Sequence, residues 1–145
     1  MRNPDQRTRM EGLPEALRRA ERSVTARLAE ALEPEGCSVE QWRILLLLGD
    51  GVGHTMSELA EFALMPAPTL TRLIDRMATD GLVHRTVDAS DRRRVLVHLT
   101  ARGEDLQRRA ARRVEEQQRA LLADTDPAGV QLLLYLLDVL AGRVR

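Results

Sequence analysis

One stretch of strand-like sequence, residues 82–99, interrupts a chain of 145 residues that otherwise has helical periodicity. Two runs of strand character, residues 82–87 and 95–99, flank a polar loop at residues 88–94. Two such runs joined by a short polar loop predict a β-hairpin. The sequence therefore predicts a mainly α fold with a single two-stranded sheet.

Four helices are predicted before the hairpin. Residues 13–33 carry apolar side chains spaced three and four apart, which predicts a long amphipathic helix. Capping-box patterns at Ser38–Gln41 and Thr55–Glu58 predict the starts of a second helix and a short third helix. A fourth helix is expected from Pro68, in its first turn, to the glycine stop at Gly81. Its predicted buried face consists of Leu70, Leu73, Ile74 and Met77.

Two helices are predicted after the hairpin. Thr100 is the expected cap of a long helix, and Asp126 with Pro127 is expected to start a last helix that runs to about Val144. The run Leu132–Leu137 is apolar on every side, so it must be buried all round. In a chain of this size a partner subunit is the expected cover, and we predict a homodimer.

The composition excludes several classes of function. Only three residues are aromatic, which argues against single-strand binding by base stacking. One cysteine and three scattered histidines provide neither an internal disulfide nor a zinc finger. The first twelve residues are too polar for a signal peptide, and the most apolar stretch is too short to span a bilayer. We therefore expect a soluble cytoplasmic protein without metal or other cofactor.

The charge is unevenly distributed, although the sequence is neutral overall. All 22 basic residues are arginines, and they balance 22 acidic residues. Residues 1–65 contain 8 arginines and 11 acidic residues, whereas residues 66–100 contain 6 arginines and 4 acidic residues. The region of the fourth helix and the hairpin is therefore locally basic, as binding to a polyanion requires.

Residues 58–78 have the order short helix, turn, helix, which is that of a helix-turn-helix unit. In such a unit the second helix enters the major groove, where short polar groups and guanidiniums bond phosphates and base edges. The outward face of that helix is predicted to present Ala67, Thr69, Thr71, Arg72, Asp75 and Arg76.

The loop of the hairpin reads Asp91-Arg92-Arg93-Arg94. Three adjacent cations repel one another in a loop that is only structural, but they fit a wing whose arginines enter a narrow minor groove. Asp91 is then expected to brace a neighbouring guanidinium. The alternative is a solvated surface turn.

Four runs of sequence carry a family resemblance: Thr69–Met77, Asp80–Arg85, Asp88–Val95 and Leu99–Gly103. In these runs the chain resembles the MarR family of bacterial transcription regulators. The arginine loop and the Leu-Thr-x-x-Gly step after it are the most specific parts. The resemblance extends from about Leu13 to the C-terminus.

The resemblance implies a single domain in a winged-helix homodimer, with residues 13–33 and 100–145 as dimerisation helices and residues 38–99 as the winged helix-turn-helix. It also implies a repressor of transcription that binds double-stranded DNA at a pseudo-palindromic operator. Arg93 matches the wing-tip arginine of the family, and Asp91 matches its acidic brace. The residues expected to contact DNA are Thr69, Thr71, Arg72, Arg76, Arg85, Asp91, Arg92, Arg93 and Arg94.

A small effector, often phenolic or anionic, is also implied, bound between the dimerisation helices and the winged helix. Trp42 and Arg43 lie near the expected cleft, although core packing with Val39 and Leu46 is the simpler role for Trp42. Cys37 raises a redox alternative, since some members of the family sense peroxides through a cysteine. Their cysteine lies within the first helix, whereas Cys37 lies in the loop before the second. The histidines lack the spacing of metal ligands, so no metal site is expected.

Two further classes of function remain as alternatives. A winged-helix module that binds another protein is compatible with Pro66 and Pro68, which occupy a helix start where a small polar cap is more usual. The three arginines of the loop argue against it. An enzyme would need an acid–base pair, a glycine-rich phosphate loop or a nucleophile elbow, and the sequence contains none of these, so no catalytic residue is expected.

Overall fold

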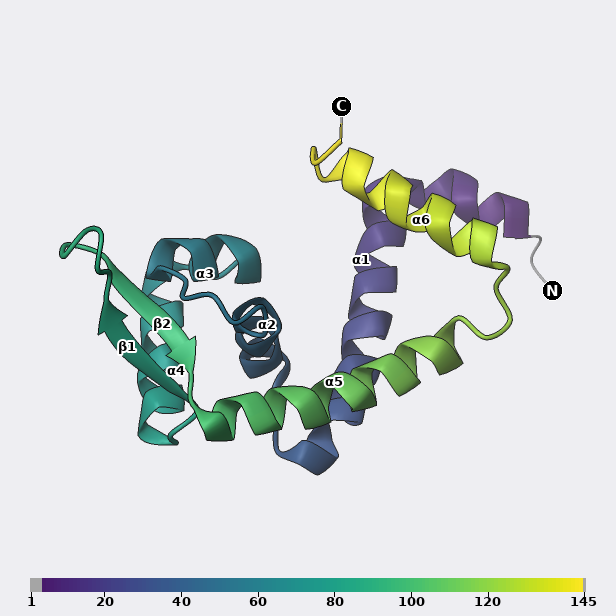
Figure 1. The fold of residues 1–145 in the computed structure, drawn as a ribbon. Helices are drawn as coiled ribbons and strands as arrows, with labels where there is room; N and C mark the ends of the chain where they lie inside the picture. The colour runs from purple at the N-terminus through teal and green to yellow at the C-terminus, as the bar shows by residue number, and fades with distance from the viewer. Residues whose placement is uncertain (1–3, 145) are drawn as a thin grey trace. The chain divides into compact units, whose positions relative to one another are not determined.

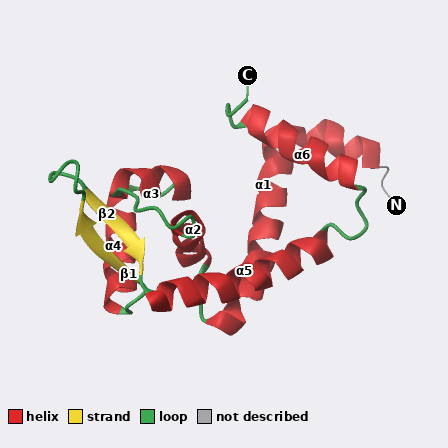
Figure 2. Cartoon of the chain, viewed as in Figure 1, coloured by secondary structure: helices red, strands yellow, loops and turns green. Residues whose placement is uncertain are grey.

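The computed structural model describes the backbone of residues 4–144 and the side chains of residues 12–144. These residues form helices and one two-stranded antiparallel sheet (Figure 2). The elements, in the chain order that Figure 1 colours, are α1 (Pro4–Leu32), η1 (Glu33–Glu35), α2 (Val39–Leu48), α3 (Met56–Ala63), α4 (Ala67–Thr79), β1 (Val83–Val87), β2 (Val95–Leu99), α5 (Ala101–Leu121) and α6 (Pro127–Leu140). The predicted mainly α fold with a two-stranded sheet is confirmed.

The chain forms two compact units that divide within α5, between Val114 and Glu115. The first unit contains the hydrophobic core. Its largest fully buried side chains are Leu32, Ile44, Leu45, Leu48, Leu59, Leu70, Ile74, Met77 and Val97. They come from α1, α2, α3, α4 and β2, so a single core fixes the short helices against the sheet.

Two capping boxes place α2 and α3, as predicted. The Ser38 hydroxyl accepts a hydrogen bond from the Gln41 backbone N–H at 3.1 Å, and the Gln41 side chain accepts one from the Ser38 N–H at 3.0 Å. Thr55 and Glu58 make the same reciprocal pair at the start of α3. Each box satisfies two backbone donors that a helix start otherwise leaves unpaired.

The hairpin pairs Val83 with Leu99 and Val87 with Val95, and an isolated bridge joins His54 to Val97. The chain then turns tightly into α5, where the Thr100 hydroxyl accepts a hydrogen bond from the Gly103 N–H. A Cβ atom at Gly103 would overlap the carbonyl oxygen of Leu82. Glycine is therefore required where α5 leaves the sheet.

Two predicted helix ends were wrong. The backbone is helical from Pro4 rather than from Leu13, with a kink at Gly12, whose φ of 63° is left-handed. Residues 4–11 are polar and gave no apolar stripe, so the periodicity could not reveal this first part. The last helix ends at Leu140 rather than near Val144, and Gly142, with φ of 72°, follows its end.

In the second unit, α6 begins where the sequence predicts. The Asp126 carboxylate accepts hydrogen bonds from the N–H groups of Ala128 and Gly129, each at 3.0 Å, and Pro127 occupies the first turn. None of the residues of α6, all of which the structure describes, is buried in the single chain. Its large apolar side chains, Leu132 to Leu137, Val139 and Leu140, are 38–57% exposed.

Candidate nucleic-acid interface

Helix α4 separates its apolar and polar residues onto two faces. The four residues predicted as its buried face, Leu70, Leu73, Ile74 and Met77, are all buried. Thr69, Thr71, Arg72 and Arg76 are all exposed. The Thr71 hydroxyl donates to the Ala67 carbonyl at 3.0 Å, while the guanidinium groups of Arg72 and Arg76 engage no partner among the described residues. The outer face of α4 thus offers two cations and two hydroxyls to a ligand.

The turn between α3 and α4 sets the direction of α4. Leu64 caps α3 in the left-handed conformation, with φ of 53° and ψ of 45°, and the Met65 N–H donates to the Ala60 carbonyl at 3.0 Å. Pro66 is the N-cap of α4 and provides no side-chain cap. The short helix, tight turn and second helix are the predicted helix-turn-helix arrangement.

Two carboxylates fold the loop at residues 88–94. Asp88 accepts hydrogen bonds from the N–H and the hydroxyl of Ser90, at 2.9 and 2.8 Å. These bonds lower the pKa of Asp88. Asp91 accepts a hydrogen bond from the Arg93 N–H at 3.0 Å, and its carbonyl accepts one from the Arg94 N–H. Asp91 therefore braces the backbone of the turn, whereas a brace on a guanidinium was predicted.

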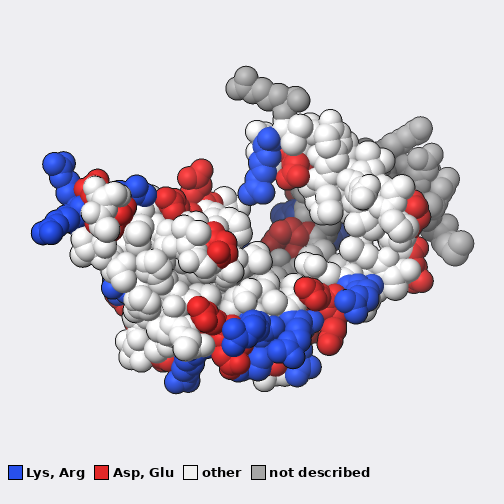
Figure 3. Space-filling model, viewed as in Figure 1, with Lys and Arg blue, Asp and Glu red and all other residues white. Residues whose placement is uncertain are grey.

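The three loop arginines are exposed but not equivalent. The guanidinium of Arg94 lies 3.4 Å from a Glu58 carboxylate oxygen and 3.9 Å from one of Asp88. Those of Arg92 and Arg93 engage no partner within the described residues. Basic side chains project at the tip of the hairpin in Figure 3. Two of the three arginines are therefore free for an anion, and the third is held at the base of the loop.

Arg85 is also held. Its guanidinium lies 2.5 Å from a carboxylate oxygen of Asp75, so this ion pair links β1 to α4. Sequence reasoning assigned Arg85 to DNA and missed this partner, and it assigned Glu58 only to a capping box. Glu58 and Arg94 are 36 residues apart, so no local pattern could reveal their contact.

A cleft of about 770 Å³ lies between the end of α1, the start of α2 and α4. Its lining includes Thr25, Cys37, Gln41, Leu73 and Arg76. Trp42 and Arg43 are not among the lining residues, and Trp42 is a core residue with 5% of its surface exposed. The structure thus places the expected effector residues beside the cleft rather than in it.

Cys37 is buried in the core. Burial, together with the nearby Glu35 carboxylate, raises the pKa of its thiol to about 11. The thiolate is the form that reacts with peroxides, and at neutral pH it is strongly disfavoured here. These surroundings do not favour the redox alternative.

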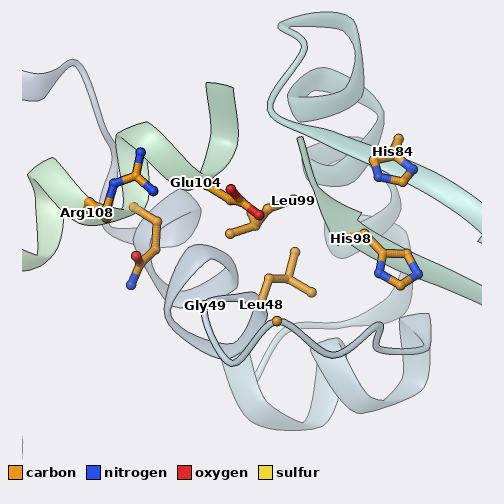
Figure 4. Close-up of a pocket in the computed structure, with 9 residues that line it drawn as sticks. Leu48, Gly49, His84, His98, Leu99, Glu104 and Arg108 are labelled. Atoms are coloured by element: carbon orange, nitrogen blue, oxygen red, sulfur yellow. The ribbon is translucent and has the colours of Figure 1, made fainter. Parts of the chain in front are cut away.

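A second cavity, of about 370 Å³, lies between the hairpin and α5. Figure 4 shows His84 and His98 on adjacent strands, with Glu104 and Arg108 on α5. The two imidazole rings stack with centroids 5.4 Å apart. Among the residues whose side chains are described, no group of three His, Cys, Asp or Glu side chains could hold a metal ion.

Comparisons with known proteins agree on one family. A model described as the MarR family matches residues 35–94. Over 99 residues, which are 68% of this chain and 67% of the relative, the sequence is 34% identical to the homoprotocatechuate degradative operon repressor of Escherichia coli.

No helix in the described part of the chain is long and apolar enough to cross a membrane.

Two solved structures resemble the fold over most of its length. One is the transcriptional repressor CouR bound to a 23-mer DNA duplex, with a TM-score of 0.82 and 28% identity over 90% of this chain and 93% of that one. The other is NadR in complex with 4-hydroxyphenylacetate, with a TM-score of 0.78 and 31% identity over 87% of this chain and 89% of that one.

Proposed function

This chain belongs to the MarR family, and on that premise we propose that it is a sequence-specific transcriptional repressor that binds double-stranded DNA as a homodimer. One observation carries the proposal. The outer face of α4 and the tip of the hairpin both present arginines without a partner among the described residues: Arg72, Arg76, Arg92 and Arg93. A free guanidinium is the group that pairs with phosphates and with guanine edges.

The two elements have different tasks in this proposal. Helix α4 enters the major groove with Thr69, Thr71, Arg72 and Arg76. The wing, defined as β1, β2 and the loop at residues 88–94, lies along the duplex and inserts Arg93 into the minor groove. Asp91 fixes the backbone of that loop, and Arg85 and Arg94 hold the wing to α4 and α3. Free arginines make the contacts, and paired arginines shape the surface.

We propose that α6 supplies part of the dimer contact. A helix with eight large apolar residues, none of them buried in one chain, requires a cover. A second copy of the same helix provides one, with residues 13–33 and 100–145 as the dimerisation part of a single domain. Two copies would then read half-sites about 34 Å apart, one helical turn of DNA.

An effector is proposed to act through the cleft between α1, α2 and α4. Arg76 lines this cleft and also belongs to the proposed DNA-binding face. A small phenolic or anionic molecule in the cleft would draw on the same cation that DNA uses. The NadR complex with 4-hydroxyphenylacetate supports this class of ligand. Binding of the effector would therefore weaken the binding of DNA, and binding of DNA would weaken the binding of the effector.

We propose that the protein acts in the cytoplasm, where the chromosome of a bacterium lies, and that it has no enzymatic activity. Family membership supports both statements.

The test is fluorescence anisotropy with labelled duplexes from upstream of its own gene, at two salt concentrations and with a scrambled duplex as competitor. We expect tight binding that weakens with salt, because phosphate contacts release counterions. The scrambled duplex should fail to compete. Equal affinity for the two duplexes would mean that the operator lies elsewhere or that the winged helix serves a protein partner, and a pull-down would separate these two outcomes.

A further inference from the structure

His54 lies between two carboxylates. Its Nε2 is 2.7 Å from an oxygen of Asp50, and its Nδ1 is 2.8 Å from Oε2 of Glu58. The imidazole is largely buried, with 16% of the side chain exposed. Its backbone is fixed as well, since the His54 and Val97 peptide groups exchange two hydrogen bonds, at 3.1 and 2.8 Å.

These two contacts define the protonation state of the ring. A neutral imidazole carries one N–H. Its other nitrogen would then face a carboxylate oxygen with no hydrogen between them, so that the lone pairs of the two atoms repel each other. Only the imidazolium donates from both nitrogens. Burial alone lowers the pKa of His54, but the hydrogen bonds and charges of Asp50 and Glu58 outweigh it and raise the pKa above its ordinary value.

The second oxygen of Glu58 connects this site to the wing. Glu58 Oε1 lies 3.4 Å from the Arg94 guanidinium, and Arg94 also lies 3.9 Å from Asp88 at the base of the loop. A chain of contacts therefore runs from Asp50 through His54, Glu58 and Arg94 to Asp88. On the strand side, the His98 ring lies against Gly53 and is hydrogen-bonded to Thr86 at 2.9 Å.

We propose that His54 is a positioning residue of the wing: a neutral ring can donate to only one of its two carboxylates, so loss of the proton changes how Glu58 is held against Arg94 and weakens binding to duplex DNA. The proposal rests on the proposed function for its second half. With the imidazolium in place, this chain of five groups carries three negative and two positive charges. Loss of the proton changes its net charge from −1 to −2, beside a surface that must attract phosphates.

The sign of the pH dependence follows from the raised pKa of His54. The stabilisation that the protonated ring gives to its contacts with Asp50 and Glu58 is fully present below about pH 6.5, the usual pKa of histidine, and is lost as the pH rises through the higher folded pKa. Affinity for DNA should therefore fall as the pH increases across this interval.

The first test uses the free protein and NMR. The chain has only three histidines, so the three imidazole signals can be assigned by comparison with His54→Gln and His84→Gln. We expect the Arg94 side-chain signal and the loop amides to shift with the His54 titration. This shift should disappear in His54→Gln and remain in His84→Gln. A loop that does not follow His54 would overturn the link, whether or not the protein binds DNA.

The second test is the pH profile of duplex affinity. Between about pH 6 and pH 8.5 the wild type should lose roughly two- to fivefold more affinity than His54→Gln, as expected for one partly exposed ion pair. His84→Gln should keep the wild-type profile. Identical profiles for wild type and His54→Gln would overturn the proposal. Absence of duplex binding at every pH would instead refute the proposed function, and with it the effect on affinity, while the NMR titration still decides the link.

Discussion

Helices α4 and α6 have 13 and 14 residues and a proline in the first turn, yet they differ in where their apolar residues go. Helix α4 buries four apolar residues within one chain and leaves a polar face exposed. Helix α6 contains the run Leu132–Leu137, which is apolar on all sides, and none of its residues is buried. The free surface of α4 is therefore suited to an anionic, hydrated ligand, and that of α6 to another apolar surface.

The N-terminal caps of the two helices also differ. Asp126 caps α6 through two backbone N–H groups, whereas Pro66 leaves α4 without a side-chain cap. The first turn of α4 is thus not neutralised by a carboxylate, and its positive end stays available to a phosphate. The two helices therefore expose surfaces for different partners, and separate substitutions can test each surface.

The largest effect is expected from charges placed on α6. Leu132→Glu combined with Leu136→Glu puts two carboxylates on one face of the helix, at positions that are 57% and 47% exposed in the single chain. If α6 is covered by a second copy, both charges are buried without partners. The dimer dissociation constant should then rise about 1,000-fold or more, measured by sedimentation.

The matched control is Gln131→Glu, which adds a negative charge at the neighbouring, polar position. It should shift the dissociation constant far less. A double variant that remains as dimeric as the wild type would show that α6 is not part of the subunit contact, and the comparison with α4 would lose its basis.

The next effect concerns the buried face of α4. Ile74 is fully buried, so Ile74→Ala should lower the free energy of unfolding by about 2–5 kcal/mol, measured in urea. Leu134→Ala removes as many carbon atoms from α6, where the side chain is 57% exposed. Its cost should be small in dilute protein and grow with protein concentration. A similar, concentration-independent cost for both variants would mean that α6 is buried within its own chain.

The sequence was most informative where structure depends on neighbouring residues. Capping boxes four residues long predicted the starts of α2 and α3, and spacing alone predicted the four buried residues of α4. The hairpin runs were predicted to within one residue. These signals are local because a backbone donor or a helix face is satisfied within a few residues.

Contacts between distant segments were not predictable in this way. Arg85 was expected to contact DNA, but packing of β1 against α4 brings it to Asp75. Arg94 was expected to contact DNA, and its approach to Glu58, like that of Glu58 to His54, was not predicted. The position of a charged residue in the sequence does not indicate which distant residue it pairs with. The sequence therefore predicted where the basic surface lies but not which of its arginines are paired within the chain.

A smaller effect is expected at the wing. Arg93→Ala should weaken operator binding by about 1–3 kcal/mol in the anisotropy assay, the usual cost of losing an arginine inserted into a groove. Arg112→Ala, which removes an exposed arginine from α5, is the matched control and should change affinity little. Arg93→Ala should not alter the dimer, because Arg93 lies in the loop of the wing. Equal losses for both would indicate a general charge effect and remove the special role of Arg93.

The smallest effect concerns the approach to α4. Leu64 is left-handed, with φ of 53°, and is 89% exposed, so its side chain gains little from burial while its backbone is strained. Asparagine tolerates this conformation better than leucine. Leu64→Asn should therefore raise the free energy of unfolding by up to about 1 kcal/mol, a few degrees in Tm. Val52→Asn is the control, because Val52 is 61% exposed and its φ is not positive. It should bring no gain, since it relieves no strain. A Leu64→Asn variant no more stable than Val52→Asn would show that the turn into α4 is as relaxed as the capped start of α6.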